Sequence, residues 1–174
     1  LGHDYNMEQL YGDNYGYRSW LNGSMVKHLG TIADKAKILA NLQPGDLIID
    51  IASNDGTTLA AYGDHGYDLL WVDPTSKKFS EYYPSYVKYV SDFFSETAVR
   101  TKTNKKAKVI TSMSMFYDLP DPTTFVEDVK NVLADDGIWI LEQSYMPTMI
   151  DMVSYDTVCH EHLEYYALKQ IKWL

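Results

Sequence analysis

The chain of 174 residues has a single cysteine, Cys159, so it can form neither an intrachain disulfide nor a thiolate-rich structural zinc site. No apolar run approaches the roughly 20 residues needed to cross a bilayer, and the first residues lack a basic-then-apolar signal pattern. Basic residues are few, with 15 Lys and Arg against 24 Asp and Glu. Nucleic-acid binding needs a basic face, so the net charge of −9 argues against such partners. We expect a cytoplasmic protein without membrane or nucleic-acid partners.

Tyrosine, in contrast, is abundant, with 15 Tyr against 5 Phe. A tyrosine buries apolar area and carries a hydroxyl, which suits sites for polar ligands, although most single tyrosines simply line surfaces and turns. The length and the 45% apolar composition suffice for one domain with a full core. Because the first residue is Leu1, we expect the chain to be a fragment or a processed product.

Short apolar runs alternate with helix-like segments over most of the chain. The apolar spacing from Met25 to Ala40 predicts a helix over residues 24–41 with Ser24 as its N-cap. Strands are predicted at residues 47–51, 68–74, 86–90, 108–111 and 137–142. Helices are predicted within residues 58–66, stopping at Gly63 or Gly66, and near residues 76–83, 95–102 and 122–134. Nearly all-apolar strands alternating with helices are typical of a parallel sheet covered on both faces. The sequence thus predicts a Rossmann-like α/β fold with its ligand at the carboxyl ends of the strands.

The first predicted strand leads into the turn DIASNDGT, residues 50–57. A dinucleotide site would need G-x-G-x-x-G here, because backbone must approach the pyrophosphate closely. This turn has only Gly56, and the carboxylate of Asp55 would repel phosphate oxygens. S-adenosylmethionine has no phosphate and carries a sulfonium and an ammonium, so acidic side chains favour it. Asn54 tolerates a left-handed backbone and can make the turn beside Gly56. We expect this cofactor to contact Asp50, Ala52, Ser53, Asn54 and Gly56.

Acidic and aromatic residues follow the next two predicted strands. Asp73, followed by Pro74, is placed to accept the ribose hydroxyls, as an acidic residue about 20 positions downstream does in adenosine-binding folds. Asp92 could accept from the adenine amino group, and Phe93 could stack on the ring. Each has a plain structural alternative: Asp73-Pro74 is a common turn, and Asp92 could be a helix N-cap reaching toward Glu96.

The last two predicted strands end in further candidates. Ser112 and Met113 follow the fourth, where backbone carbonyls and a methionine could lie against the sulfonium, although Met is more often core filler. Gln143 and Tyr145 follow the fifth and are expected to face the substrate.

At this point a family resemblance emerges from DIASNDGT, WVDPT, SDFF, SMFYDLPDP, GIWILEQSYMP and YDTVCHEHLEYYAL. These stretches resemble the central portion of the S-adenosylmethionine-dependent C-methyltransferases that act on nucleotide-linked keto-sugars in deoxysugar biosynthesis. YGYRSWLNGSMVKHL is similar to that family's lead-in to its cofactor domain. The resemblance spans nearly the whole chain and implies a class I methyltransferase fold with an N-terminal helical lead-in.

The chain also departs from that family. Its members usually carry a Cys-rich zinc module before this region and a further substrate domain after it, and both are missing here. Asp118 stands where the sugar enzymes typically have His, and Cys159 where they commonly have Tyr.

The cluster His160-Glu161-His162 is not a zinc-protease motif, because H-E-x-x-H would need His where Glu164 stands, and we expect no metal site. If residues 158–163 are extended, His160 and His162 share one face and Glu161 lies on the other. Methylation next to a ketone requires removal of an α-proton, for which histidine is suited at neutral pH.

The resemblance implies His162 as the base, with Glu161 second and Tyr17 as a possible helper from the N-terminal loop. His160 is expected to contact the substrate. The structural alternative is that the two histidines hydrogen-bond to backbone and anchor the segment after the fifth strand.

Three regions are expected: an N-terminal loop and helix (1–41), a cofactor domain (42–145) and the start of a truncated substrate-binding segment (146–174). The predicted function is C-methylation of a keto-sugar or similar small carbonyl compound. One alternative is a catalytically incomplete S-adenosylmethionine-binding module that needs a partner chain, and another is an NAD-dependent oxidoreductase. Truncation would expose apolar surface, which favours a homodimer.

Overall fold

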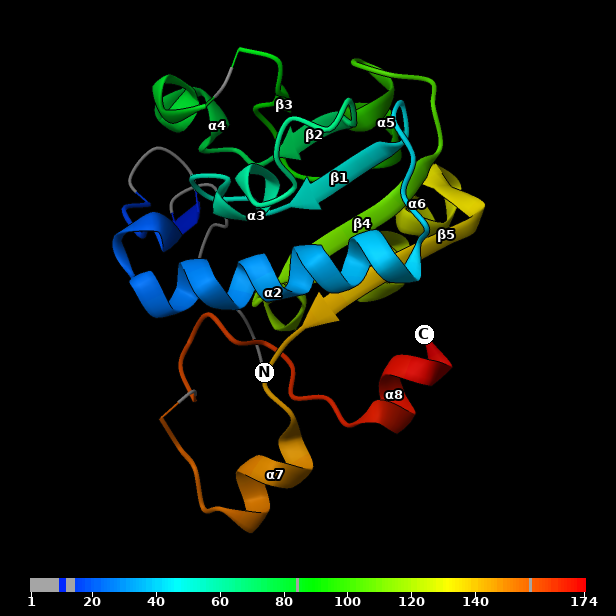
Figure 1. Cartoon of the computed structure of the whole chain (residues 1–174). Helices are drawn as coiled ribbons and strands as arrows, with labels where there is room; N and C mark the ends of the chain where they lie inside the picture. Colours follow the sequence, from blue (N-terminus) through cyan, green and yellow to red (C-terminus); the bar gives the residue numbers. More distant parts are fainter. Residues whose placement is uncertain (1–9, 12–14, 84, 157) are drawn as a thin grey trace.

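The computed structural model describes residues 10–11, 15–83, 85–156 and 158–174. Its centre is a five-stranded parallel sheet with strand order β3-β2-β1-β4-β5 (Figure 1). The strands are β1 (Leu47–Ile51), β2 (Asp68–Val72), β3 (Lys88–Val90), β4 (Ala107–Met113) and β5 (Leu133–Glu142). All five predicted strands are present, so the parallel α/β prediction is confirmed.

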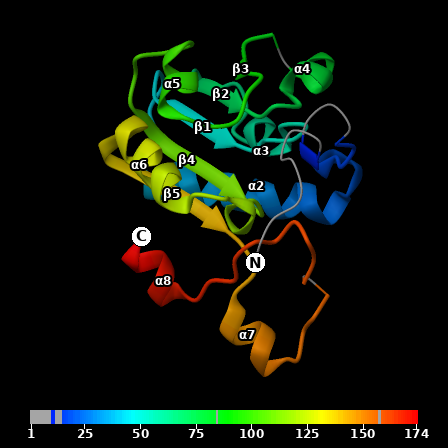
Figure 2. The same cartoon turned by 180° about the vertical axis from the view of Figure 1, so that it is seen from behind.

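Helices cover both faces of the sheet (Figures 1 and 2). On one face lie α2 (Gly23–Leu39), α3 (Thr57–Ala60) and α4 (Ser76–Phe79), and on the other α5 (Glu96–Arg100) and α6 (Pro122–Val132). The remaining elements are α7 (Met146–Asp151), α8 (Leu168–Trp173) and the 3-10 helices η1 (Ser19–Leu21), η2 (Ser80–Tyr82) and η3 (Phe116–Asp118). The α7 helix lies beyond the carboxyl end of β5, whereas α8 lies beside that strand (Figure 1), and Ile171 of α8 packs against the core under α5 and α6.

The central strand β1 contributes side chains to two hydrophobic cores, one on each face of the sheet. Ile49 and Ile51 belong to the core under α5 and α6, whereas Ile48 belongs to the core under α2 and α3. Successive side chains of a strand point to opposite faces, so a fully apolar strand can bury both sides. This double burial fixes the carboxyl end of β1 rigidly beneath the turn that follows it.

Two predicted details at helix starts are wrong. The N-cap of α2 is Asn22, whose Oδ1 accepts from the backbone N–H of Ser24 (3.1 Å) and Met25 (3.4 Å), so Ser24 lies inside the first turn. Asn22 has the extended backbone that a cap requires, and its short amide reaches back to the free N–H groups. The N-cap of α5 is Ser95, so the alternative role of Asp92 as a cap is also wrong.

The α3 helix is shorter than predicted. It ends at Ala60, before both predicted stops, Gly63 and Gly66, and Gly63 follows in a left-handed conformation with φ of +70°. A left-handed residue cannot continue the helix, so the early glycine sets its end.

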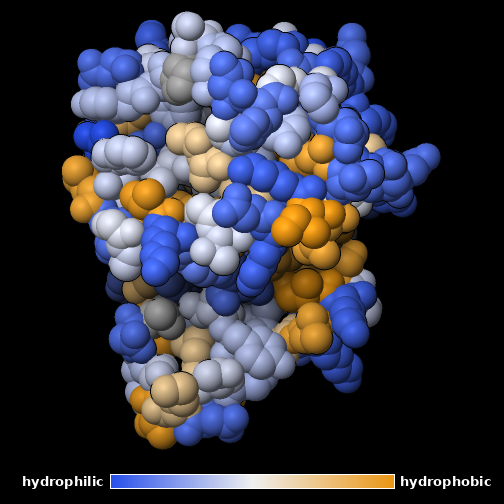
Figure 3. Space-filling view, viewed as in Figure 1, coloured by the Kyte–Doolittle hydropathy of each residue, from blue (hydrophilic) through white to orange (hydrophobic). Residues whose placement is uncertain are grey.

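Coverage of the sheet is weakest at the β5 edge, where most residues are half-buried. Ile38 and Leu39, at the end of α2, are 79% and 71% exposed, and Figure 3 shows a hydrophobic area over this end of the helix. Within the described ranges, no helix combines the length and apolar character that crossing a bilayer requires.

Candidate functional site

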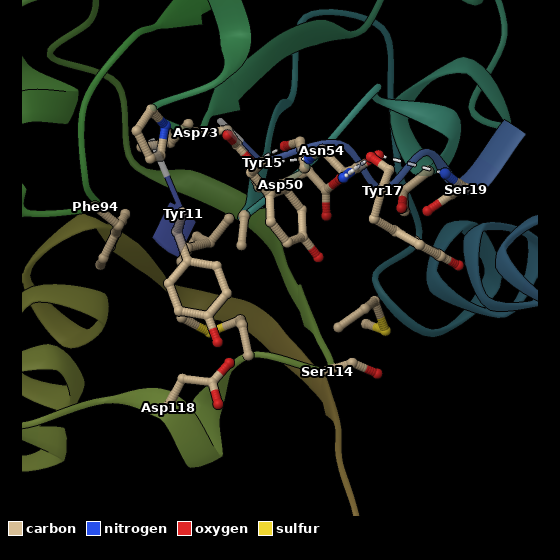
Figure 4. Close-up of a pocket in the computed structure, with 18 of the residues that line it drawn as sticks. Tyr11, Tyr15, Tyr17, Ser19, Asp50, Asn54, Asp73, Phe94, Ser114 and Asp118 are labelled. Carbon is tan, nitrogen blue, oxygen red and sulfur yellow. Dashed lines mark hydrogen bonds between the residues drawn. The ribbon is translucent and has the colours of Figure 1, made fainter. Parts of the chain in front are cut away.

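A cavity of about 360 Å³ lies at the carboxyl ends of β1, β2 and β4. The chain leaves β1 toward β2 on one side and enters β4 on the other, so the turns after β1 and β4 diverge and leave space between them. Three tyrosines of the N-terminal segment, Tyr11, Tyr15 and Tyr17, complete the wall (Figure 4). The cavity therefore lies where the strand pattern predicted a ligand.

The turn after β1 contains three residues in the left-handed region: Ala52 (φ +55°), Asn54 (φ +56°) and Gly56 (φ +66°). The prediction for Asn54 is confirmed, whereas the left-handed conformation of Ala52 had no signal in the sequence. The backbone N–H of Gly56 donates to the carbonyl of Ser53 at 2.7 Å and closes the turn. Ala52, Ser53 and Asn54 line the cavity, but Gly56 does not and instead begins α3 as its N-cap.

Asp50, at the end of β1, lines the floor of the cavity and is almost completely buried. One carboxyl oxygen accepts from the Thr111 hydroxyl, and the other has no hydrogen-bond partner. Burial raises the pKa of Asp50 to about 7, against the opposing effect of hydrogen bonds from Thr111, Ser53 and Thr58. A buried acceptor without a donor is costly, so Asp50 is suited to receive a donor from a ligand.

Asp73 follows β2 and joins two turns. Its Oδ2 accepts from the N–H of Asn54 at 2.8 Å, and its Oδ1 accepts from the N–H of Thr75 at 2.6 Å and from the Thr75 hydroxyl. Burial raises the pKa of Asp73, and these hydrogen bonds oppose the rise. A carboxylate offers about four lone-pair positions, so one remains for a ligand hydroxyl. The carboxylate lines the cavity beside Pro74, as the sequence predicted, while also serving the turn.

The residues after β3 divide between cavity and solvent. Phe93 and Phe94 line the cavity, but Asp92 is exposed, does not line it, and accepts from the N–H of Phe93 at 2.8 Å. The structure therefore does not bring Asp92 to the predicted adenine position. Phe94, which the sequence analysis did not single out, supplies a second aromatic wall.

The end of β4 contributes Met113, Ser114 and Met115 to the cavity. Ser112 does not reach it, because its hydroxyl is buried on the other side and accepts from Trp139 Nε1 at 2.9 Å. Side chains alternate along a strand, so Ser112 and Met113 at the end of β4 point to opposite sides, and only Met113 reaches the cavity.

Asp118, at the end of η3, is 6% exposed and also lines the cavity. A hydrogen bond joins its carboxyl to the Tyr11 side chain, and within the described part of the chain its buried Oδ1 has no hydrogen-bond partner. Burial raises the pKa of Asp118 to about 7, the Tyr11 hydrogen bond opposes this, and the charge of Glu161 adds to it. The sequence showed Asp118 only as a departure from the related family.

The His160-Glu161-His162 cluster does not line the cavity. The chain bends at residues 160–161, so the condition under which both histidines would share one face, an extended segment over residues 158–163, is not met. His160 is exposed, whereas the His162 ring packs against the Tyr117 ring with centroids 4.1 Å apart. The N–H groups of residues 163 and 164 donate to the Tyr117 carbonyl at 2.9 and 3.1 Å. Tyr117 lines the cavity, so His162 is separated from it by one side chain.

The remaining candidates after β5 also lie outside the cavity. Gln143 is half-buried with its Oε1 unpartnered, and Tyr145 is 47% exposed. Glu142, just before them, pairs with His28 of α2 at 2.7 Å, which ties the end of β5 to that helix. Within the described part of the chain, no three His, Cys, Asp or Glu side chains come together as metal ligands would.

Residues 15–20 cross over the turn after β1 and are fastened to it. The Asn54 amide donates to the Tyr17 carbonyl at 2.7 Å, and Asn54 Oδ1 accepts from the N–H of Ser19 at 3.3 Å (Figure 4). The Asp55 carboxylate accepts from the N–H of Trp20 at 3.0 Å. We call residues 15–20 the strap. The sequence pointed to this segment through its tyrosines and its similarity to the family's lead-in, but not to these contacts, which join positions about 35 apart.

The charge of the cavity wall is one-sided. Among the residues that the structure describes, Asp50, Asp73 and Asp118 line it, and no lysine or arginine does. Phosphate groups need cationic or backbone N–H donors, whereas a cation is favoured by nearby carboxylates. The cavity is thus suited to a cationic ligand with hydroxyl groups and an aromatic ring, and unsuited to a diphosphate.

Comparison with known sequences gives one family and one curated relative. Residues 25–174 match the family described as Methyltransferase domain. The chain is 26% identical over 170 residues to the C-methyltransferase NovU of Streptomyces niveus, covering 97% of this chain. It spans 40% of the length of that relative.

Comparison with solved structures shows the same fold at low identity. The plantazolicin methyltransferase BamL, solved with a desmethylPZN analog and SAH, has a TM-score of 0.67 at 11% identity over 87% of this chain and 61% of its own. BpumL, solved with a triazolic analog and SAH, gives 0.64 at 13% identity over 89% and 64%. A putative methyltransferase in complex with the Haloferax volcanii Trm112 activator gives 0.60 at 13% over 91% and 75%. These likenesses establish the class I methyltransferase fold.

Proposed function

Because this chain belongs to the methyltransferase domain family, we propose that it binds S-adenosylmethionine and transfers the methyl group to a carbon of a small carbonyl compound. A nucleotide-linked keto-sugar is the leading acceptor class, since the motifs resemble enzymes of that kind and the curated relative is a C-methyltransferase. The relative is 26% identical and is matched over 40% of its length, so activity and acceptor are the substance of the proposal.

One observation carries the cofactor assignment: three aspartates and no basic side chain line the described wall of the cavity. S-adenosylmethionine brings a sulfonium and an ammonium, each of which gains from nearby carboxylates. Asp73 would accept a ribose hydroxyl at its remaining lone pair, and Phe93 and Phe94 would pack on the adenine. Asp50 would accept a donor at its unpartnered oxygen.

The acceptor is assigned to the side of the cavity formed by η3, the residues after β4 and the N-terminal tyrosines. Met113, Met115 and Leu119 make this side apolar, and Tyr11, Tyr15 and Tyr117 give it hydroxyl groups. Phenols and aromatic rings suit a hydroxyl-rich ring compound. We propose that residues 42–145 bind the cofactor and that residues 146–174 contribute to the acceptor side. Gln143 and Tyr145 at the end of the first range, and His160 in the second, would contact the substrate after the segment that follows β5 moves.

The proposed reaction determines what this chain must contribute to the chemistry. Methyl transfer from a sulfonium needs alignment and a nucleophilic acceptor, and the bound cofactor supplies the methyl group. The protein's own tasks are to hold the acceptor carbon in line, exclude water, and remove an α-proton. The role of His162, Glu161 and Tyr17 in that last task stays a prediction.

Calorimetry followed by a turnover assay tests the proposal. The chain is titrated with S-adenosylmethionine, S-adenosylhomocysteine and NADH, and then incubated with S-adenosylmethionine and a panel of nucleotide-linked keto-sugars. We expect binding of both sulfur compounds, no binding of NADH, and a product heavier by one methylene.

Each other outcome identifies an alternative. Binding of the sulfur compounds without turnover on the panel would favour a cofactor-binding module that needs a partner chain. A binding signal with NADH and none with the two sulfur compounds would contradict the proposal and favour an oxidoreductase. The family match and the acidic turn already disfavour that alternative.

A further inference from the structure

Asp118 stands apart from the other two carboxyl groups of the cavity. Figure 4 shows it across the cavity from Asp50, Asn54 and Asp73. Its neighbours are the apolar residues after β4 and the Tyr11 side chain, whose hydroxyl points to the carboxyl group (Figure 4). Asp118 therefore faces the side that we assign to the acceptor.

The carboxyl group of Asp118 is held but incompletely satisfied. Asp73 is occupied by Asn54 and Thr75, whose N–H groups shape the turns around it. Asp118 has the hydrogen bond with Tyr11, and its buried Oδ1 finds no partner among the described residues. A buried, unpartnered carboxyl oxygen lowers stability unless a ligand supplies a donor. The arrangement leaves one oxygen available to a hydrogen on the acceptor.

The surroundings give Asp118 the acid-base behaviour that proton transfer needs. Burial raises its pKa to about 7, and the groups that face it are Tyr11, Tyr15, Tyr117 and Glu161. A general base works best when its pKa lies near the working pH, because it is then both ionised and basic enough. An ordinary exposed aspartate, with a pKa near 4, would be a poor base for a carbon acid.

The sequence candidate for this task is less well placed. His162 lies behind Tyr117 with its ring packed at a tilt against that phenol, and it does not line the cavity. A base must come within hydrogen-bond reach of the proton that it removes. His162 could do so only after Tyr117 moves, whereas Asp118 is already at the wall.

We propose that Asp118 is the catalytic base that removes the α-proton of the carbonyl acceptor, a role that rests on the proposed function. The C–H bond breaks, its proton goes to the Asp118 carboxylate, and its electron pair becomes the enolate. The enolate carbon forms a bond to the methyl carbon as the methyl–sulfur bond breaks and leaves its electron pair on sulfur. The charge balances, because a cationic cofactor and a carboxylate become a neutral thioether and a carboxylic acid. Tyr11 is a positioning residue that orients the carboxylate.

The test compares Asp118→Asn and Tyr11→Phe with His162→Gln and with Asp135→Asn, an exposed carboxylate of β5 that serves as the matched control. For each variant we would measure kcat, KM, the Kd of S-adenosylmethionine, and exchange of the acceptor α-proton with D2O in the presence of S-adenosylhomocysteine. The exchange reports proton removal without methyl transfer. Carboxyl titration by NMR with 13C-labelled aspartate gives a readout that needs no turnover.

We expect Asp118→Asn to lower kcat and the exchange rate by about 10²- to 10⁴-fold, the usual contribution of a general base, while the cofactor Kd stays within about threefold. The Asp118 carboxyl signal should titrate near pH 7. In Tyr11→Phe both this titration and the acidic limb of the pH profile of kcat should move to higher pH. The reason is that the Tyr11 hydrogen bond holds the pKa of Asp118 down, and the variant removes that bond. The Asp135→Asn chain should keep the exchange rate of the unaltered chain, and His162→Gln, the variant of the competing candidate, should lose far less of it than Asp118→Asn.

Several results would overturn the assignment. One is an Asp118→Asn chain that keeps more than about a tenth of the exchange rate, because a tenfold loss is much smaller than the loss expected from removing a general base. The assignment would also fail if His162→Gln lost the exchange activity while Asp118→Asn kept it, or if the Asp118 carboxyl titrated near pH 4. If Asp118→Asn does not fold, the pH profile of Tyr11→Phe is the deciding measurement. An acidic limb of kcat at the same pH as in the unaltered chain contradicts the proposal. Absence of methyl transfer by the unaltered chain would remove the proposed function together with this role, whereas turnover without dependence on Asp118 would remove this role alone.

Discussion

The hydroxyl oxygen of Tyr83 lies 1.0 Å from the position that a Cβ on Gly56 would occupy. The Tyr83 ring also stacks on the buried Trp71 with centroids 3.9 Å apart, so it cannot simply move aside. Gly56 is therefore fixed by two constraints, its left-handed φ of +66° and the phenol that fills the space above it. The sequence singled it out as a possible cofactor contact, and the structure gives it a packing role beneath the turn.

Replacing Gly56 by Ala should destabilise the chain by about 2–4 kcal/mol, because left-handed strain adds roughly 1–2 kcal/mol to the displacement of a packed aromatic side chain. Urea unfolding measures the change. The control is Gly30→Ala in the middle of α2, where nothing lies within 4 Å of an added Cβ. That control should gain about 0.5–1 kcal/mol, since glycine is unfavourable in a helix. A Gly56→Ala chain as stable as the original would refute the packing role.

Removal of the Asn54 side chain should release the strap. Asn54→Gly keeps the left-handed backbone free of strain but loses the bonds to the Tyr17 carbonyl and the Ser19 N–H. We expect faster hydrogen exchange at Ser19 and Trp20, and dissociation of S-adenosylmethionine faster by about tenfold, which corresponds to about 1.4 kcal/mol.

Asn41→Gly is the matched control for that change, because Asn41 is another left-handed asparagine, with φ of +48°, on the exposed surface after α2. Its exchange pattern at the strap should equal that of the unaltered chain. Equal exchange at Ser19 in the Asn54→Gly chain would show that the strap is held by other contacts.

The buried carboxyl of Asp118 should make stability depend on pH. Its pKa is raised from 3.8 to about 7 on folding, so the folded chain binds the proton more tightly than the unfolded chain. The stability from protonation is full below about pH 4 and is lost as the pH rises toward 7. Asp118→Asn should therefore gain stability relative to the original chain between pH 4 and 8, by roughly 2–4 kcal/mol, given about 1.4 kcal/mol per pKa unit.

Thermal or urea unfolding at several pH values measures this difference, with Asp135→Asn as the exposed control. The absolute stability of Asp118→Asn can change in either direction, because the amide has its own hydrogen-bond needs. The informative quantity is the slope of the difference with pH. A flat difference would mean that the Asp118 carboxyl titrates as an exposed group does.

Asp73→Asn should weaken cofactor binding by about tenfold or more. An amide at this position would oppose one of the N–H donors from Asn54 and Thr75, and it would lose the charge that favours a cationic ligand. Calorimetry gives the affinity, and Asp64→Asn, on an exposed turn, is the control. Unchanged affinity in Asp73→Asn would move the ribose contact to another residue.

The sheet and its cavity were predictable because they follow from local patterns. The apolar run at 47–51 and the asparagine-glycine turn after it specify a buried strand and left-handed residues with few alternatives. The errors arose where tertiary contacts or a neighbouring residue decide. Asn22 rather than Ser24 is the N-cap of α2 because Asn22 has the extended backbone that an N-cap requires.

Parts of the site were beyond the sequence for the same reason. Asp118 and Tyr11 meet across more than a hundred residues, and burial, which no local pattern reports, sets the pKa of that carboxyl. The bend at residues 160–161 separates two histidines that alternation had put on one face. Asp92 and Ser112 lie at the predicted strand ends, yet their side chains are directed elsewhere.

The three carboxyl groups that line one cavity repel one another when they are ionised and no ligand is bound. Any compound that supplies a positive charge or a well-placed donor relieves this repulsion, and its binding free energy adds directly to resistance against heat. Melting curves recorded across a chemical library would then rank candidate acceptors before any reaction is known. The same curves, taken with the cofactor product already bound, would reveal which compounds need it in place first.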